Sequence, residues 1–324
     1  MKRFLAFVLA ALMAVSVSAC SNSSSSGKSG GGQDGKAGVD MRFWIFLNPD
    51  ATSDPRSTVL KGIVDDYNKN NKYGNKVYVE SINYSKFESQ AIQAAAAGTG
   101  PDIINIYTDM LKKHIDGGTV QPMTAMAEEF IKTMPDYMYK ADTLKVKDQI
   151  YTLPWETRTF TYWYRSDVFP SVPKTWDELI STAAPKTSGS TLGFTFGLSE
   201  GGNGAGFMES FNPLLKAAGG DLLDGSGKAA FNSDAGAKVL NMMKTMVEKK
   251  VMNNSALSMT VDDVQSGLIS GSVESCLLGT QRAASVSKSS FSSQIKSAPI
   301  PGFTEGTPAP AIVAGQSLGA VSYT

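Results

Sequence analysis

The sequence has very few of the residues on which metal sites, catalytic triads and disulfide frameworks depend. Of its 324 residues, one is histidine (His114) and two are cysteines (Cys20 and Cys276). A single histidine, predicted here to be an exposed helical residue, excludes multi-histidine metal sites and leads us to set aside His-based triads. Cys276 lies in an apolar, strand-like run, which favours a buried inert thiol over the alternative of a nucleophile. We expect no catalytic residues, no metal and no cofactor.

The chain also lacks an excess of charge and a long internal apolar stretch. Lys plus Arg and Asp plus Glu number 30 each, and without Lys2 and Arg3 the balance is 28 against 30, or −2. This argues against a nucleic-acid partner, which needs a basic face. No segment after the N-terminus is long and apolar enough to span a bilayer. The 42% hydrophobic and 19% charged composition instead indicates a globular body.

The N-terminus carries a targeting pattern. Residues 1–19 combine Lys2 and Arg3 with a short apolar run, which predicts a cleaved signal peptide. Val17-Ser18-Ala19-Cys20 resembles the bacterial lipobox, which implies that Cys20 is lipidated; ordinary cleavage with an incidental cysteine is the alternative. Residues 20–39, rich in Ser and Gly, then form a flexible tether. We expect an extracytoplasmic protein held on the membrane through its lipid.

The first part of the body alternates strand and helix signals. Met41–Leu47 is nearly continuous in apolar residues, and Asp54-Pro55 has the N-cap and first-turn pattern of a helix. A β-rich segment at Lys76–Ile82 precedes an alanine-rich helix ending at Gly98. Ile103–Tyr107 is a further apolar strand. The order predicts an α/β lobe with a mostly parallel sheet.

A central block of motifs carries a resemblance to a known family. It consists of Tyr151-Thr152-Leu153-Pro154, an aromatic strand at Tyr162–Tyr164, Arg165-Ser166-Asp167-Val168-Phe169, and Pro173-Lys174-Thr175-Trp176-Asp177-Glu178-Leu179. In this order the block resembles the extracellular solute-binding proteins of sugar importers, the maltose-binding-protein-like group. Shorter matches such as Gly100-Pro101-Asp102-Ile103 and Pro299-Ile300-Pro301-Gly302 extend the resemblance from about Met41 to the end.

The resemblance implies an α/β, two-lobed periplasmic-binding-protein-like fold of type II. On that template the N-terminal lobe comprises residues 40–156 plus 264–312, and the C-terminal lobe comprises residues 157–263 plus 313–324. The family continues with further helices of the second lobe, so we expect the C-terminal lobe to be incomplete in this sequence, which ends at Thr324.

The implied function is capture of a solute rather than catalysis. The protein would bind an extracellular mono- or oligosaccharide in a cleft between the lobes, as a monomer, and deliver it to the permease subunits of an ABC importer. Two alternatives remain open. A surface-anchored glycoside hydrolase could use Glu156 and Asp109 as its carboxylate pair. A surface sensor or adhesin could use the same fold without transport.

Candidate ligand contacts follow the predicted strands of the first lobe, where binding residues concentrate in α/β sheets. Asn48 and Asp50 follow the first strand, with turn formation as the alternative role. Tyr107 and Asp109 follow the third strand. Asp109 also matches a sugar-binding aspartate of the family, and helix capping is its alternative role.

Further candidates lie at and beyond the predicted crossing. Trp155, Glu156 and Arg158 cluster there, with an interlobe salt bridge packed under a Trp as the alternative. Asn203 and Phe207 flank a Gly-rich stretch that could instead be a surface loop.

The last candidates lie in the C-terminal third. Gln281 and Arg282 stand where the family often has a stacking Trp, and Gln316 and Ser317 are weaker candidates. Alternation and capping context, by contrast, predict core positions for four aromatic residues, Tyr162, Trp163, Tyr164 and Trp176.

Overall fold

A computed structural model describes residues 38–52, 54–83, 86–135, 144–199, 205–311 and 313–322. The signal peptide, Cys20 and most of the tether lie outside the described residues. The chain divides into two compact units, unit 1 with residues 1–157 and 315–324, and unit 2 with residues 158–314. Each unit is described by itself.

Unit 1 is built on a sheet whose central strands are parallel. Its elements are β1 (Asp40–Ile45), α2 (Pro55–Asn70), β2 (Lys76–Ser81), α3 (Phe87–Ala96), β3 (Ile103–Tyr107), η3 (Thr108–Met110), α4 (Leu111–Asp116), α5 (Thr124–Ile131), the start of β4 (Thr152–Arg165) and the end of β7 (Val313–Ala320). The strand order is β2-β1-β3-β7-β4. β1 pairs parallel with both β2 and β3, as the strand–helix alternation predicts, and β7 returns antiparallel beside β3.

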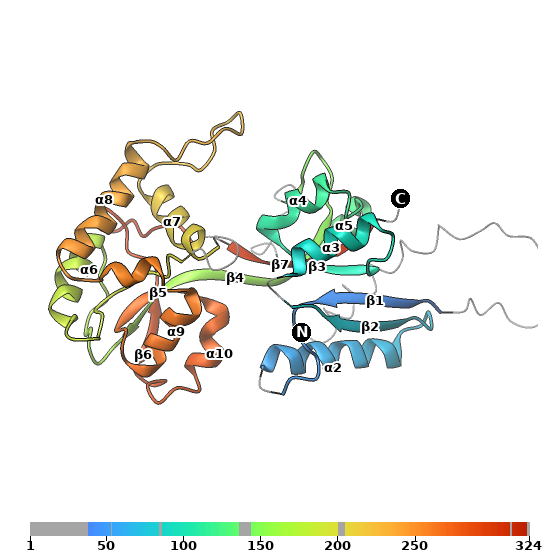
Figure 1. The fold of residues 1–324 in the computed structure, drawn as a ribbon, viewed down its shortest axis with the longest axis horizontal. Coiled ribbons are helices and arrows are strands. Elements are labelled where there is room, and N and C mark those ends of the chain that lie inside the picture. Colours follow the sequence, from blue (N-terminus) through green and yellow to red (C-terminus); the bar gives the residue numbers. More distant parts are fainter. Residues whose placement is uncertain are drawn as a thin grey trace, which may run out of the picture. The chain divides into compact units, whose positions relative to one another are not determined.

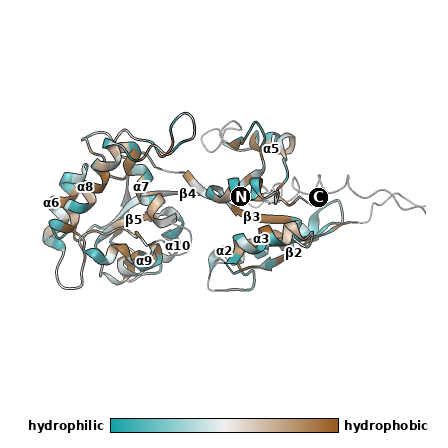
Figure 2. Ribbon diagram, turned by 45° about the horizontal axis from the view of Figure 1, so that its top comes forward, coloured by the Kyte–Doolittle hydropathy of each residue, from teal (hydrophilic) through white to brown (hydrophobic). Residues whose placement is uncertain are grey.

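Helices cover both faces of this sheet. Leu60 and Ile63 of α2 and Phe130 of α5 pack on one face, whereas Phe87 of α3 and Leu111 of α4 pack on the other. Figure 1 shows α2 running alongside β1 and β2. Figure 2 shows β3 in the brown of hydrophobic residues, consistent with its burial between the two layers. The helix starts follow local rules: Asp54 caps α2 by accepting a hydrogen bond from the backbone N–H of Arg56.

Unit 2 is also a sheet between helices. It contains the rest of β4, α6 (Trp176–Ala183), η5 (Ala184–Lys186), α7 (Ala205–Ala217), α8 (Asp234–Glu248), η6 (Asn254–Leu257), α9 (Val261–Ser270), β5 (Ser275–Gly279), η7 (Thr280–Arg282), α10 (Ala283–Val286), β6 (Ile295–Ala298) and the start of β7. β4 pairs antiparallel with β5 and β6. One core cluster joins α6, α7 and α8, and a second joins α9 and α10.

The aromatic residues predicted to be core are core residues. Tyr162, Trp163 and Trp176 are buried, and Tyr164 is half-buried against the same cluster as Tyr162. Tyr162 and Tyr164 stack with ring centroids 5.4 Å apart. Burial of these rings contributes apolar area that stabilises unit 2.

The predicted lobe membership of the C-terminal third was wrong. Residues 264–312 were assigned to the N-terminal lobe, yet they belong to unit 2, because β5 and β6 pair with its part of β4. Residues 315–322 were assigned to the C-terminal lobe, yet β7 pairs with β3 in unit 1. The chain crosses after Thr157 and after Ala314. Long-range strand pairing decides such membership, and no local pattern reports it.

His114 is also placed differently from the prediction. It was expected on the surface, but its side chain is 0% exposed and its Nε2 shares a hydrogen bond with the carboxylate of Glu88. A short helix such as α4 presents one face to the core, and this histidine occupies that face with a polar partner from α3.

Two further observations concern Cys276 and the membrane. Cys276 is buried as predicted, and burial raises the pKa of its thiol, which favours the inert thiol over the nucleophile. Within the described ranges, no helix has both the length and the apolar character needed to cross a membrane.

Candidate ligand-binding site

In unit 1, several candidate residues meet at one edge of the sheet. β1 and β3 run parallel, so the residues that follow them, Asn48 and Asp50 after β1 and Asp109 after β3, emerge at the same edge. Tyr107 ends β3, and it pairs with Gln316 near the start of β7. The carboxyl ends of parallel strands are where open α/β sheets bind ligands.

Asn48 takes the alternative role weighed for it, turn formation. Its side-chain Oδ1 accepts a hydrogen bond from the backbone N–H of Asp50 at 3.0 Å, and its backbone carbonyl accepts one from Ala51. Asp50 is exposed and lies 3.8 Å from the Nζ of Lys61. An exposed pair of this kind contributes little to stability, so the Asp50 carboxylate can exchange this partner for another.

An aromatic surface lies at the same edge. Tyr107 stacks on Phe46 with ring centroids 6.3 Å apart and planes inclined by 29°. The guanidinium of Arg56 lies 5.6 Å from the centre of the Phe46 ring. The pKa of the Arg56 guanidinium is raised mainly by the hydrogen bond to Asp54, with smaller contributions from Glu156 and Tyr107. Arg56 is thus a cation beside the aromatic surface that Phe46 and Tyr107 form.

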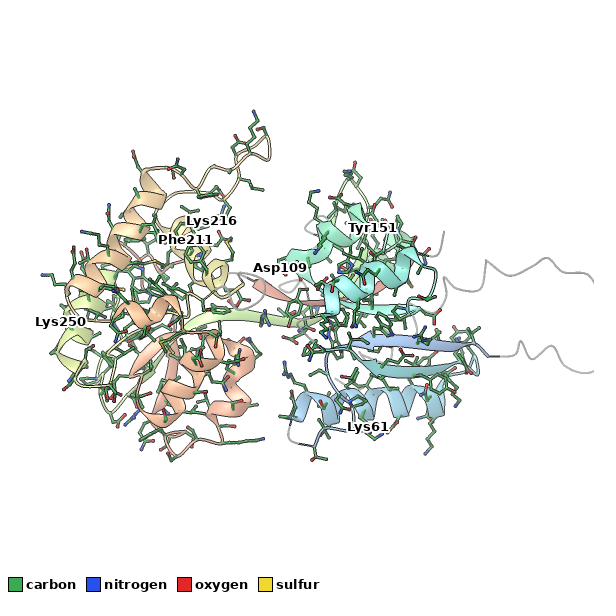
Figure 3. The ribbon with its side chains drawn as sticks, in the orientation of Figure 1. Lys61, Asp109, Tyr151, Phe211, Lys216 and Lys250 are labelled. Carbon is green, nitrogen blue, oxygen red and sulfur yellow. The ribbon has the colours of Figure 1, made fainter. Side chains whose placement is uncertain are left out.

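Asp109 is exposed within η3 and does not occupy a helix N-cap position. The N-cap positions of η3 and α4 are Tyr107 and Met110, and neither makes a side-chain capping bond. Figure 3 marks Asp109 on the short segment that follows β3. Asp109 is therefore not the N-cap residue of either helix.

Trp155 and Glu156 lie in the unit 1 part of β4, and both are half-buried. Trp155 packs against the core cluster shared with α2 and α5. Its indole Nε1 is buried and has no hydrogen-bond partner among the described residues. An unpartnered buried N–H is costly, so it marks a place where a ligand or water oxygen would be favourable.

Arg158 forms an ion pair within unit 2. Its Nη2 donates a hydrogen bond to Oε1 of Glu209 at 2.8 Å, and the two side chains are only 11% and 14% exposed. Glu209 lies on α7, two residues after Phe207. This ion pair lies inside unit 2, so it is not the interlobe salt bridge weighed as the alternative role, and its partner Glu209 was not indicated by the sequence.

The side chain of Phe207 is half-buried. It stacks on Phe211 with centroids 5.1 Å apart, next to the core of unit 2. Figure 3 marks Phe211 on α7. Asn203, predicted beside Phe207, lies outside the described residues.

Gln281 and Arg282 follow β5 in η7. The backbone N–H of Thr159 donates to the hydroxyl of Thr280 at 3.3 Å, so this segment adjoins the start of the unit 2 part of β4. Oε1 of Gln281 is buried and, in the part of the chain that the structure describes, has no partner. Arg282 instead bonds to Asp262 and to Gln265, the latter at 2.9 Å.

Sequence reasoning missed several residues at these places. Phe46, Arg56 and Glu209 each contact a candidate or act on it electrostatically, and Asn105 has a buried side-chain oxygen without a partner among the described residues. Phe46 could have been found from its position one residue before the end of the predicted first strand. Glu209 gives no local signal, because its role depends on α7 packing near Arg158.

Solved structures share this fold. A maltose-bound MalE3 from T. maritima has a TM-score of 0.73 at 20% identity, covering 88% of this chain and 73% of that one. An ABC transporter solute-binding protein from Thermotoga lettingae, bound with α-D-tagatose, has a TM-score of 0.71 at 22% identity with the same coverage. The ABC substrate-binding protein Lmo0181 from Listeria monocytogenes, in complex with cycloalternan, has a TM-score of 0.71 at 16% identity, covering 89% and 72%.

These likenesses confirm the α/β fold of the type II periplasmic binding proteins. The sequence profile of the bacterial extracellular solute-binding proteins matches residues 51–324. Such proteins bind solutes and are not enzymes, so the glycoside hydrolase alternative is not supported. The chain belongs to the family of bacterial extracellular solute-binding proteins.

Proposed function

We propose that this protein captures an extracellular carbohydrate and delivers it to the permease subunits of an ABC importer. The observation that carries the proposal is the edge of the unit 1 sheet, where aromatic rings and polar side chains gather at the carboxyl ends of parallel strands. Tyr107 and Phe46 provide stacked rings there, and Asp109 provides an exposed carboxylate.

The chemistry of this edge suits a sugar. Flat aromatic faces pack against the CH groups of a pyranose, while carboxylates and amides bond to its hydroxyls. Asp109 accepts hydrogen bonds from hydroxyl groups, and the indole N–H of Trp155 is a donor that is buried without a partner in the described part of the chain. A combination of this kind binds neutral polyhydroxy compounds through many weak contacts.

The related structures support the same ligand class. Those named above carry maltose, α-D-tagatose and cycloalternan, all of which are carbohydrates.

The proposal includes a location and a state of assembly. Cys20 would carry lipid and hold the folded body on the outer face of the membrane through the Ser/Gly-rich tether. The protein would act as a monomer, with one tethered binding body delivering its ligand to the permease.

A thermal-shift screen of the full chain tests the proposal. The panel contains D-glucose, D-tagatose, maltose, maltotriose and cycloalternan, with amino acids, dipeptides and polyamines as the comparison set. A ligand at 100 times its Kd stabilises the native state by about 2.7 kcal/mol, or roughly 5–11 °C for a domain of this size. A saccharide should give such a shift.

Asp109→Asn should reduce the saccharide shift, whereas Asp65→Asn, an exposed change on α2, should leave it unchanged. If no saccharide shifted the melting temperature while peptides or polyamines did, the carbohydrate assignment would be wrong.

A further inference from the structure

Gln316 is a buried amide whose hydrogen-bonding capacity the described residues leave unused. It lies on β7 opposite Tyr107 of β3 and is 1% exposed. Both its Oε1 and its Nε2 are buried without a hydrogen-bond partner in the described part of the chain. Buried amides in native proteins are nearly always partnered, so an amide with both ends unpartnered needs an explanation.

The strand on the other side of β7 brings Trp155 next to Gln316. β4 neighbours β7 in the sheet, and the two strands run in opposite directions, since β4 leaves unit 1 where β7 enters it. Gly315 lies against the carbonyl oxygen of Glu156, which fixes the register. One residue further into unit 1, Gln316 is therefore beside Trp155, whose indole Nε1 also lacks a partner among the described residues.

Alternation along the strands places these side chains on one face. Leu318, two residues after Gln316, and Leu153, two residues before Trp155, belong to the same core cluster, and Trp155 packs against that cluster. Tyr107, Gln316 and Trp155 thus form a row across three adjacent strands, here called the aromatic–amide row. The row lies at the edge of the sheet where Asp109 emerges.

We propose that the aromatic–amide row is a hydroxyl-binding subsite, in which Gln316 and Trp155 bind vicinal hydroxyl groups of a neutral saccharide. The inference rests on the proposed function. An amide accepts through Oε1 and donates through Nε2, and a hydroxyl does both, so a pair of hydroxyls satisfies both ends of Gln316. The indole N–H of Trp155 donates to a further oxygen, and the ring of Tyr107 packs against the CH groups of the sugar.

The row also has a consequence for specificity. Its three members are uncharged, so their own hydrogen-bonding groups match neutral hydroxyls; the guanidinium of Arg56 lies beside the neighbouring Phe46 ring and is not a member of the row. A site built to bond hydroxyls discriminates strongly against analogues that lack them, because its buried polar groups are then left without partners.

The competing explanation is a structural one, in which a buried water or local repacking satisfies Gln316. Asn105 is a reason to consider it, because its Oδ1 is also buried without a described partner, two residue pairs further from the edge. The two explanations differ in what happens when the amide is replaced by an apolar group of similar shape.

Gln316→Met in the full chain separates them, with Kd measured by calorimetry for each saccharide of the panel that binds the wild type. We expect a Kd about tenfold weaker or more, together with an unchanged or higher melting temperature without ligand, since an unpartnered buried amide has been removed. Trp155→Phe, which keeps the ring and removes the N–H, should also weaken binding. Leu318→Met, on the same strand and face, is the matched control and should leave Kd within about twofold of the wild-type value.

Each result bears on the inference. An unchanged Kd in Gln316→Met and Trp155→Phe, with saccharide binding intact in the wild type, would overturn the subsite and leave the proposed function standing. An equal loss in Leu318→Met would attribute the effect to packing and would also overturn it. If no saccharide of the panel bound the wild type, the proposed function and this inference would fall together.

Discussion

A methyl group added at Gly315 would lie 1.9 Å from the carbonyl oxygen of Glu156. Real contacts of this type are not shorter than about 3 Å, so Gly315→Ala requires β7 or β4 to shift by more than 1 Å. The obstacle is backbone, which cannot rotate away as a side chain can. We therefore expect this single methyl group to destabilise unit 1.

The magnitude follows from the cost of overpacking, typically about 1–3 kcal/mol. A shift of β7 would also weaken the hydrogen bond from the hydroxyl of Thr108 to the carbonyl of Gly315, now 3.1 Å. At about 2–4 °C per kcal/mol, the melting temperature of unit 1 should fall by roughly 2–12 °C.

The assay is differential scanning calorimetry of Gly315→Ala beside Gly62→Ala. Gly62 is exposed in the middle of α2, and a methyl group there meets nothing within 4 Å. Alanine at that position should stabilise by about 0.4–1 kcal/mol. The reasoning would be refuted if Gly315→Ala melted at or above the wild-type temperature, because the close approach of the two strands would then have no energetic weight.

Three further predictions concern charges and a thiol. Arg158→Ala should lower the free energy of unfolding by about 3–5 kcal/mol, because it removes the guanidinium that pairs with the mostly buried carboxylate of Glu209. Chemical denaturation measures this loss, and a loss below about 1 kcal/mol would contradict the prediction. The pKa of Glu80 is lowered mainly by its hydrogen bond to Arg42, so its contribution is present above the ordinary glutamate pKa and is lost as pH falls through the lower folded value. Glu80→Gln should thus lower the free energy of unfolding by less than about 1 kcal/mol at pH 7, because the Arg42–Glu80 pair is exposed. Urea titrations should show this difference from the wild type vanishing in acid, and a difference that grew below pH 4 would contradict the prediction. Cys276, in a variant whose other cysteine is serine, should resist thiol reagents at pH 8 until the protein unfolds, because burial raises the pKa of its thiol; labelling of the native protein would show the opposite.

The parts of the fold that were predicted correctly rest on local physics. The apolar strand around Phe43 and the Asp54-Pro55 helix start were readable because burial and capping act over a few residues. The same holds for Thr175, which caps α6 by accepting a hydrogen bond from the N–H of Glu178. Alternation likewise identified Tyr162 and Trp163 as core residues on opposite faces of β4.

The candidate site was predictable only in part. Strand ends pointed to Tyr107 and Asp109, because polar residues after a buried parallel strand collect at one edge. They could not reveal that Arg158 pairs with Glu209, since 51 residues separate the two along the chain. The weak sequence signal at Gln316 likewise gave no hint of an amide buried without a described partner.

The sequence by itself determined the α/β class, the helix starts, the core aromatics and, through the motifs around Pro154 and Trp176, the family. Tertiary structure alone decided which strands share a sheet, that His114 is buried against Glu88, and which charges are paired. The physical reason is the range of the interactions. Capping, turns and periodicity depend on neighbours along the chain, whereas strand pairing and buried ion pairs depend on residues that only folding brings together.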